Sequence, residues 1–223
     1  ACRLASEGIR VIINYNGSVE QAEQVQRQIR EAGGQAEIYQ CNVADFASCE
    51  TFVSDGVKTW GRIDILVNNA GITRDGLLMR MTEEDFDQVL DTNLKGAFHM
   101  MRFVSRQMLK QRCGRIINMA SQSAETGGLA ASPIYAASKA AVWCMTKSLA
   151  GEMGPYQVTV NAVAPGYIMT EMTRNAGYRD DMVPMKRLGT PEDVADVVGF
   201  LASEDSRYVT GMIVDINGGT VMR

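Results

Sequence analysis

Histidine and paired cysteines, which supply many transition-metal sites, are scarce in this sequence. The 223 residues include one histidine, His99, and five scattered cysteines, no two of which stand at the spacing of a zinc or redox motif. We therefore expect no metal site, and we expect His99 to lie on a helix at a surface or an interface. The thiols are expected to be reduced, as in the cytoplasm, where we place the protein. The cysteines are Cys2, Cys41, Cys49, Cys113 and Cys144.

The sequence also lacks a long apolar run and an excess of one charge. A membrane-spanning helix needs about 20 predominantly apolar residues in succession, and no uninterrupted apolar stretch approaches that length. The net charge is −4, with acidic and basic residues mixed along the chain. This balance argues against nucleic acid as an obligate partner. We expect neither a membrane nor a nucleic acid among the partners.

Alternating element types predict an α/β fold. No stretch rich in proline, glycine or serine divides the chain, so we expect one domain over residues 1–223. Short β-branched runs alternate with amphipathic runs of helical length, as in proteins with a parallel sheet. The expected strands are 10–14, 36–40, 63–67, 115–119, 158–164 and 212–216. The expected helices include 19–32, 46–60, 82–111 with a break near Asn93, and 191–202.

Tyr135 and Lys139 are the first candidates for chemistry. Four residues apart in a helix-favouring run, they lie on one helix face. A nearby ammonium lowers the pKa of a phenol from about 10. Reaching about 7 would require roughly 4 kcal/mol of differential stabilisation. Such a phenol can exchange a proton with a carbonyl or alcohol oxygen. The alternative is that the pair merely occupies an exposed helix face.

Four further motifs accompany this pair in a fixed order. They are Asn68-Asn69-Ala70-Gly71, Asn93, Ser121 after an apolar run, and Pro165-Gly166. Together with Tyr135 and Lys139, this order resembles the short-chain dehydrogenase/reductase family over essentially the whole chain. The run from residue 68 to 81, NNAGITRDGLLMRM, is most similar to bacterial 3-oxoacyl-[acyl-carrier-protein] reductases. The resemblance implies a Rossmann-type doubly wound parallel sheet with helices on both faces.

The resemblance also implies catalytic roles. Tyr135 would donate the proton, and Lys139 would lower its pKa and bind the nicotinamide ribose. Ser121 would orient the carbonyl, with Ser123 as the alternative, because Ser121 lies fourteen rather than the usual thirteen residues before the tyrosine. The extra residue falls between residues 125 and 133. Asn93 would disturb its helix and hold a water that links Lys139 to solvent.

A nicotinamide cofactor follows from the same resemblance. No carboxylate stands at positions 14–16, where NAD-specific enzymes of this fold bind the ribose 2′-hydroxyl, so NADP(H) is favoured over NAD(H). Asn68 would steady the central sheet. The residues expected to border the cofactor are Asn14, Asn42, Val43, Asn69, Ala70, Gly71, Tyr135, Lys139, Pro165, Gly166, Ile168 and Thr170.

One expected feature is missing from the sequence. Members of the family carry a first strand and a T-G-x-x-x-G-x-G loop whose amides hold the pyrophosphate, and nothing here matches it. A parallel sheet without that strand would leave a slot lined by unpaired backbone groups. We expect the functional protein to carry this segment. The alternative is a truncated, inactive subunit of a hetero-oligomer.

The substrate implied by the resemblance is a 3-oxoacyl thioester on acyl carrier protein, reduced during fatty acid biosynthesis. The acidic carrier would dock on basic residues, of which Arg112 matches one, whereas the second position holds Tyr156. Acetoacetyl-CoA or another ketone, sugar or polyol is therefore the alternative substrate.

Residues 167–190 are expected to form a mobile substrate lid. The resemblance further implies a homotetramer.

Overall fold

The computed structural model describes residues 1–128, 132–171 and 173–222. Its strands are β1 (Val11–Tyr15), β2 (Ala36–Gln40), β3 (Ile65–Asn68), β4 (Gly114–Met119), β5 (Val158–Pro165) and β6 (Ile213–Ile216). Its helices are α1 (Cys2–Ser6), α2 (Val19–Glu31), α3 (Phe46–Trp60), α4 (Glu83–Leu90), α5 (Gly96–Gln111), α6 (Ser123–Thr126), α7 (Pro133–Met153) and α8 (Pro191–Ala202).

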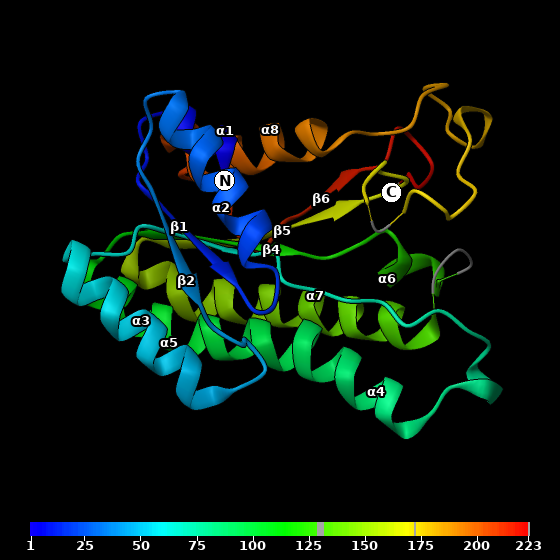
Figure 1. Ribbon diagram of the computed structural model, residues 1–223, viewed down its shortest axis with the longest axis horizontal. Coiled ribbons are helices and arrows are strands. Elements are labelled where there is room, and N and C mark those ends of the chain that lie inside the picture. The colour runs from blue at the N-terminus through cyan, green and yellow to red at the C-terminus, as the bar shows by residue number, and fades with distance from the viewer. Residues whose placement is uncertain (129–131, 172, 223) are drawn as a thin grey trace.

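All described strand pairs are parallel, as predicted. The strands form two sheets, one with the order β1-β2 and one with the order β3-β4-β5-β6. Helices α3, α5 and α7 cover one face, and α1, α2 and α8 lie on the other (Figure 1). This is the expected doubly wound α/β arrangement. Among the described residues, the β1-β2 pair is not hydrogen-bonded to the four-stranded sheet.

The core explains why the central strands read as continuous apolar runs. Side chains of a strand alternate between its two faces, and both faces of this sheet are covered by helices. In β4, Ile116 packs with the cluster formed by α5 and α7, whereas Ile117 packs with the cluster that contains α8 residues such as Leu201. All three side chains are fully buried. Burial on both faces holds β4 firmly, and with it the segment that follows its carboxyl end.

Capping residues define the helices next to the predicted site. Thr82 caps α4 in a reciprocal box with Asp85. Helix α7 begins at Pro133, after Ser132, whose hydroxyl accepts a hydrogen bond from the Tyr135 amide at 3.2 Å. Proline suits this first position because its missing N–H would have no helical partner. The cap therefore fixes where Tyr135 stands on the first turn of α7.

Helices α4 and α5 are joined by a π-helical turn, Asp91–Lys95, which contains the buried Asn93. The predicted break near Asn93 is thus confirmed. π-Turns inside helices frequently mark functional sites. Within the described ranges, no helix combines the length and the apolar character that crossing a membrane requires.

Candidate functional site

The carboxyl ends of three neighbouring strands bring the predicted motifs together. Asn68 ends β3, Met119 ends β4 and Pro165 ends β5. Because parallel strands end at the same edge of a sheet, the segments that follow them meet there. The 167–190 segment, drawn yellow to orange, lies on the same side of the molecule (Figure 1). Ligands of open α/β sheets bind at this edge.

Tyr135 and Lys139 share one face of α7, as predicted. The Lys139 Nζ lies 5.6 Å from the centre of the Tyr135 ring and donates a hydrogen bond to the Met119 carbonyl oxygen at 2.7 Å. Lys139 is buried, with 4% of its surface exposed. Burial makes the charged form costly, and it lowers the pKa of the ammonium to about 8. The pair therefore does not merely occupy an exposed helix face, because Lys139 is buried and hydrogen-bonded.

The acidity of Tyr135 differs from the sequence expectation. Burial raises the pKa of the phenol above its ordinary value, while a hydrogen bond with the Ser121 side chain acts in the opposite direction. The sequence predicted a pKa lowered by Lys139. The difference arises because the burial of a phenol cannot be read from the spacing of two residues. A raised pKa keeps Tyr135 protonated at neutral pH, which suits a proton donor.

Ser121 stands two residues beyond β4 and is buried. Its hydroxyl accepts a hydrogen bond from the Ser123 amide at 3.1 Å, and hydrogen bonding by its side chain opposes the rise in the pKa of the Tyr135 phenol. This geometry favours Ser121 over Ser123, which begins the short helix α6. The expected extra residue belongs to the 125–133 loop, and residues 129–131 of that loop lie outside the described residues.

The Asn93 side chain connects three segments. Its Oδ1 accepts a hydrogen bond from the Ile72 amide at 2.8 Å, and its Nδ2 donates to the Ile72 carbonyl and to the Ser138 hydroxyl, both at 3.0 Å. The Ser138 hydroxyl in turn donates to the Tyr135 carbonyl at 2.7 Å. Asn93 thus fastens the π-helical turn to the segment after β3 and to the first turns of α7.

Gly71 completes this junction. A Cβ added at Gly71 would stand 3.3 Å from both the Asn93 Oδ1 and the Lys139 Nζ. A small residue is therefore needed where this segment passes over the lysine. Asn69 and Ala70, just before it, are exposed. Below them, the Asn68 amide donates to Asn118 across the β3–β4 pair at 2.8 Å, in keeping with the expected role in steadying the sheet.

The predicted adenosine side gathers at the ends of β1 and β2. The Asn14 Nδ2 donates to the Cys41 carbonyl at 3.2 Å, while its buried Oδ1 accepts no hydrogen bond from the described residues. Asn42 and Val43 follow β2, and the Asn42 side chain accepts a hydrogen bond from the Ala44 amide at 3.1 Å. Asn14 therefore lies beside the segment that carries Asn42 and Val43.

Packing and hydrogen bonds within the chain hold the Pro165–Thr170 segment in place. A Cβ on Gly166 would stand 2.7 Å from the Cβ of Asn217, so only glycine fits there. The Ile168 amide, expected to hold a carboxamide, donates to the Gly166 carbonyl at 3.1 Å. The Thr170 hydroxyl lies 3.0 Å from that of Thr173. These groups already have partners within the chain, which the sequence did not predict.

Arg112 lies elsewhere. It ends α5 in a left-handed conformation, two residues before β4 begins, whereas Ser121 follows the other end of that strand. Six residues of strand span roughly 20 Å. The exposed guanidinium stacks over the Tyr156 ring at 5.8 Å and donates to the Pro155 carbonyl at 3.3 Å. Within one chain, therefore, Arg112 is not brought to the catalytic residues.

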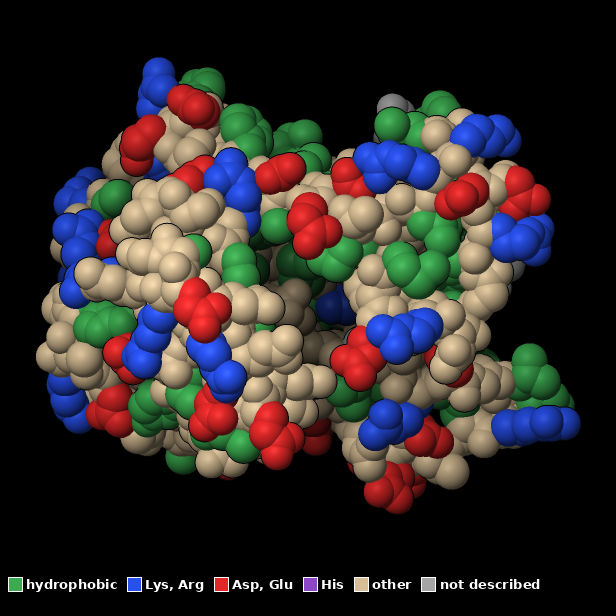
Figure 2. Space-filling view, turned by 45° about the horizontal axis from the view of Figure 1, so that its top comes forward, with side chains coloured by type: hydrophobic (Ala, Val, Ile, Leu, Met, Phe, Trp, Pro, Cys, Tyr) green, Lys and Arg blue, Asp and Glu red, His purple; other side chains and the backbone are tan. Residues whose placement is uncertain are grey.

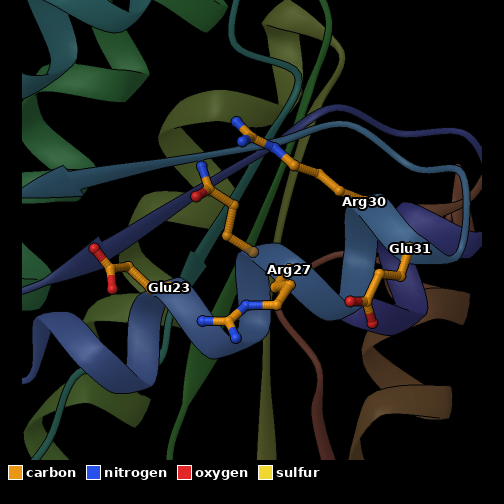
Figure 3. Close-up of a pocket in the computed structure, with 5 residues that line it drawn as sticks. Glu23, Arg27, Arg30 and Glu31 are labelled. Carbon is orange, nitrogen blue, oxygen red and sulfur yellow. The ribbon is translucent and has the colours of Figure 1, made fainter.

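Two cavities differ in their relation to the site. One, of about 330 Å³, lies between β6 and the 167–190 segment, and its lining includes Ile168, Met185 and Asn217. The other, of about 490 Å³, is formed by side chains of α2 between Glu23 and Glu31, where Arg30 reaches away toward the carbonyl of Ala36 (Figure 3). Only the first cavity includes a predicted site residue.

Figure 2 shows the surface hollowed near its middle, with basic side-chain atoms on the floor of the hollow.

Comparisons with known proteins identify the family of the chain. A family model described as enoyl-(acyl carrier protein) reductase matches residues 1–221. The chain belongs to the short-chain dehydrogenase/reductase family. It is 44% identical over 227 aligned residues to a 3-oxoacyl-[acyl-carrier-protein] reductase of Staphylococcus aureus, covering all of this chain and 92% of the relative. It is 43% identical to reductases of the same name from Synechocystis (all of this chain, 91% of the relative) and Thermotoga maritima (98% and 90%).

Membership of the short-chain dehydrogenase/reductase family implies a nicotinamide cofactor, and the described residues fit one. The buried Oδ1 of Asn14 is an acceptor that a ribose hydroxyl could satisfy. Gly71 leaves room for a ligand to approach Lys139, because it carries no side chain there. Sequence reasoning missed Ser138, Ile72 and the Met119 carbonyl, all of which hold the site through contacts between segments far apart in the chain.

Proposed function

We propose that this protein is an NADPH-dependent 3-oxoacyl-[acyl-carrier-protein] reductase of fatty acid biosynthesis. One observation carries the proposal. Asn93, in the π-helical turn, bonds Ser138 of α7, which bonds the Tyr135 carbonyl, while Lys139 of the same helix bonds the Met119 carbonyl two residues before Ser121. The names of relatives that align with the whole chain support the substrate.

The bound cofactor would supply a hydride to the ketone carbon. Tyr135 would donate its proton to the ketone oxygen, since burial keeps the phenol protonated at neutral pH. Ser121 would donate a hydrogen bond to the same oxygen and stabilise its growing negative charge. Lys139 would bind the nicotinamide ribose with the ammonium that now bonds Met119. Asn93 would hold the junction and support the proton relay to solvent.

The remaining cofactor contacts are proposed from position. Asn14 would bind the adenosine ribose, and Asn42 with Val43 would border the adenine. Asn69, Ala70 and Gly71 would follow the cofactor, and Pro165, Gly166, Ile168 and Thr170 would border its nicotinamide end. The absence of a carboxylate from positions 14–16 favours NADP(H), because nothing there repels a 2′-phosphate. We further propose a cytoplasmic homotetramer formed from single-domain subunits, with residues 167–190 as the substrate lid.

A spectrophotometric assay tests the activity. NADPH absorbance should fall when an acetoacetyl thioester is added, and turnover with NADPH should exceed turnover with NADH at equal concentrations. Faster turnover with NADH would contradict the cofactor preference. If the protein binds NADPH but reduces no 3-oxoacyl thioester, the substrate assignment is wrong. If it binds neither cofactor, the reading as an inactive subunit is supported.

The carrier-protein assignment depends on Arg112, because Tyr156 occupies the second basic position. Arg112→Glu reverses the charge of a side chain that stacks on Tyr156 and is expected to raise KM for acetoacetyl carrier protein roughly tenfold, because the acidic carrier would then meet a like charge. The KM for acetoacetyl-CoA should stay unchanged, which provides the internal control. Equal KM values for wild type and variant on the carrier substrate would favour acetoacetyl-CoA or another ketone.

A further inference from the structure

The Val43 backbone is held from a neighbouring helix by His99. The His99 Nδ1 lies 2.9 Å from the Val43 carbonyl oxygen. A carbonyl can only accept, so Nδ1 carries the hydrogen in this contact. The imidazole is buried, with 7% of its surface exposed, and it meets the Phe46 ring edge-to-face at 5.2 Å. His99 lies on a helix, as expected for a residue at a surface or an interface, but it is buried and not on the surface of the chain, and packing fixes its orientation.

Two more contacts converge on the same residue. The Cys49 thiol donates to the Val43 carbonyl at 3.3 Å, so this oxygen has one strong and one weak donor. One turn before His99, Gly96 faces the Val43 side chain, and a Cβ there would stand 2.7 Å from the Val43 Cγ2. Helix α5 thus holds Val43 by a hydrogen bond and receives its side chain where a glycine leaves space.

The segment around Val43 has little freedom left. The Asn42 side chain accepts from the Ala44 amide at 3.1 Å, and the Asp45 side chain caps α3 by accepting from the Ser48 amide at 2.6 Å. Val43 stands between these two local structures and is anchored to α5 through His99. The bond from His99, together with the packing of Val43 on Gly96, therefore helps to set how far the Asn42–Val43 segment lies from α5, and hence its position at the end of β2.

We propose that His99 is a positioning residue for the adenine end of the cofactor site. This inference rests on the proposed function, which places Asn42 and Val43 beside the adenine. His99 does not touch the reacting atoms, and its hydrogen bond acts through Val43. Loss of that bond should weaken binding of the adenine-bearing half of the cofactor and leave the nicotinamide half and the proton transfer by Tyr135 unaffected.

A matched pair of variants isolates the hydrogen bond. His99→Leu and His99→Asn remove the ring equally and have nearly the same shape. Of the two, only asparagine has a donor, Nδ2, that is separated from the backbone by the same number of bonds as the imidazole Nδ1. Dissociation constants for NADPH, adenosine 2′,5′-bisphosphate and nicotinamide mononucleotide are measured on the full chain. Circular dichroism shows whether each variant is folded, and kcat is measured at saturating NADPH.

His99→Leu should weaken NADPH and adenosine 2′,5′-bisphosphate about fivefold to tenfold, the equivalent of one hydrogen bond. Nicotinamide mononucleotide and kcat should change less than about twofold, and His99→Asn should recover most of the lost affinity. Equal losses in both variants, or a loss shared by the nicotinamide fragment, would overturn the inference, because ring packing or general disruption would then explain them. If wild type binds adenosine 2′,5′-bisphosphate and His99→Leu binds it equally well, the inference fails while the proposed function stands. Failure of wild type to bind NADPH would overturn both.

Discussion

Replacing Tyr135 by phenylalanine is expected to lower kcat by at least ~100-fold, the low end for the loss of a general acid. The substitution removes one oxygen and keeps the ring that packs near Lys139. Ser121 would still hydrogen-bond the ketone oxygen, but the phenol that transfers its proton to that oxygen would be gone. Steady-state turnover with NADPH and an acetoacetyl thioester measures the effect, and the melting temperature of the variant should stay close to that of wild type.

The control for this experiment is Tyr39→Phe. The Tyr39 hydroxyl donates to Asp55 at 2.9 Å, between β2 and α3. This substitution removes the same hydroxyl group from a tyrosine that lies away from the catalytic residues, so kcat should be unaffected. Near-normal turnover of Tyr135→Phe would refute the acid role of Tyr135. A parallel loss of turnover in Tyr39→Phe would show that the assay reports general damage.

Elements with local signals were predictable from the sequence. Helices α3 and α8 begin and end where the sequence placed them, because Asp45, Gly61, Thr190 and Pro191 carry capping or turn chemistry within a few residues. Strand β2 also has its predicted limits, whereas the other strands shifted by one or two residues at one or both ends, since pairing with neighbours and not local composition decides where a strand begins. The parallel α/β order followed from alternation alone.

Contacts between distant segments were not predictable in the same way. The break at Asn93 was expected, but its bonds to Ile72 and Ser138 join residues 21 and 45 positions away. The burial of His99 and its bond to Val43 across 56 positions left no mark in the local pattern. The direction of the Tyr135 pKa shift was also missed, because desolvation depends on what the finished fold packs around the phenol.

The buried ammonium of Lys139 should impose a cost on folding that depends on pH. The ordinary pKa of 10.5 falls to about 8 in the folded protein because the charge is desolvated. At pH 7 both folded and unfolded chains carry the proton, so the folded state bears the full cost of burying it. As pH rises through about 8, the folded protein releases the proton while the unfolded chain retains it up to about 10.5. Wild-type stability should therefore rise over this interval relative to a variant without the ammonium.

Lys139→Met removes the titrating group and keeps an unbranched side chain of similar length. We compare the free energy of unfolding of the variant with that of wild type by subtracting the second from the first. This difference should be about 2–3 kcal/mol larger at pH 7 than at pH 10, so the variant gains most in relative stability at pH 7. The lost bond to the Met119 carbonyl destabilises the variant at both pH values, because neutral and charged lysine both donate, and the greater strength of the charged donor is already contained in the pKa shift. Denaturant unfolding at the two pH values measures the difference, and Lys147→Met, at an exposed position on the same helix, serves as the control. A pH-independent difference would mean that Lys139 is not desolvated. The expected result, together with loss of turnover in Lys139→Met, would mean that the fold bears a stability cost at neutral pH to keep an ammonium beside Tyr135, which a purely structural lysine would not explain.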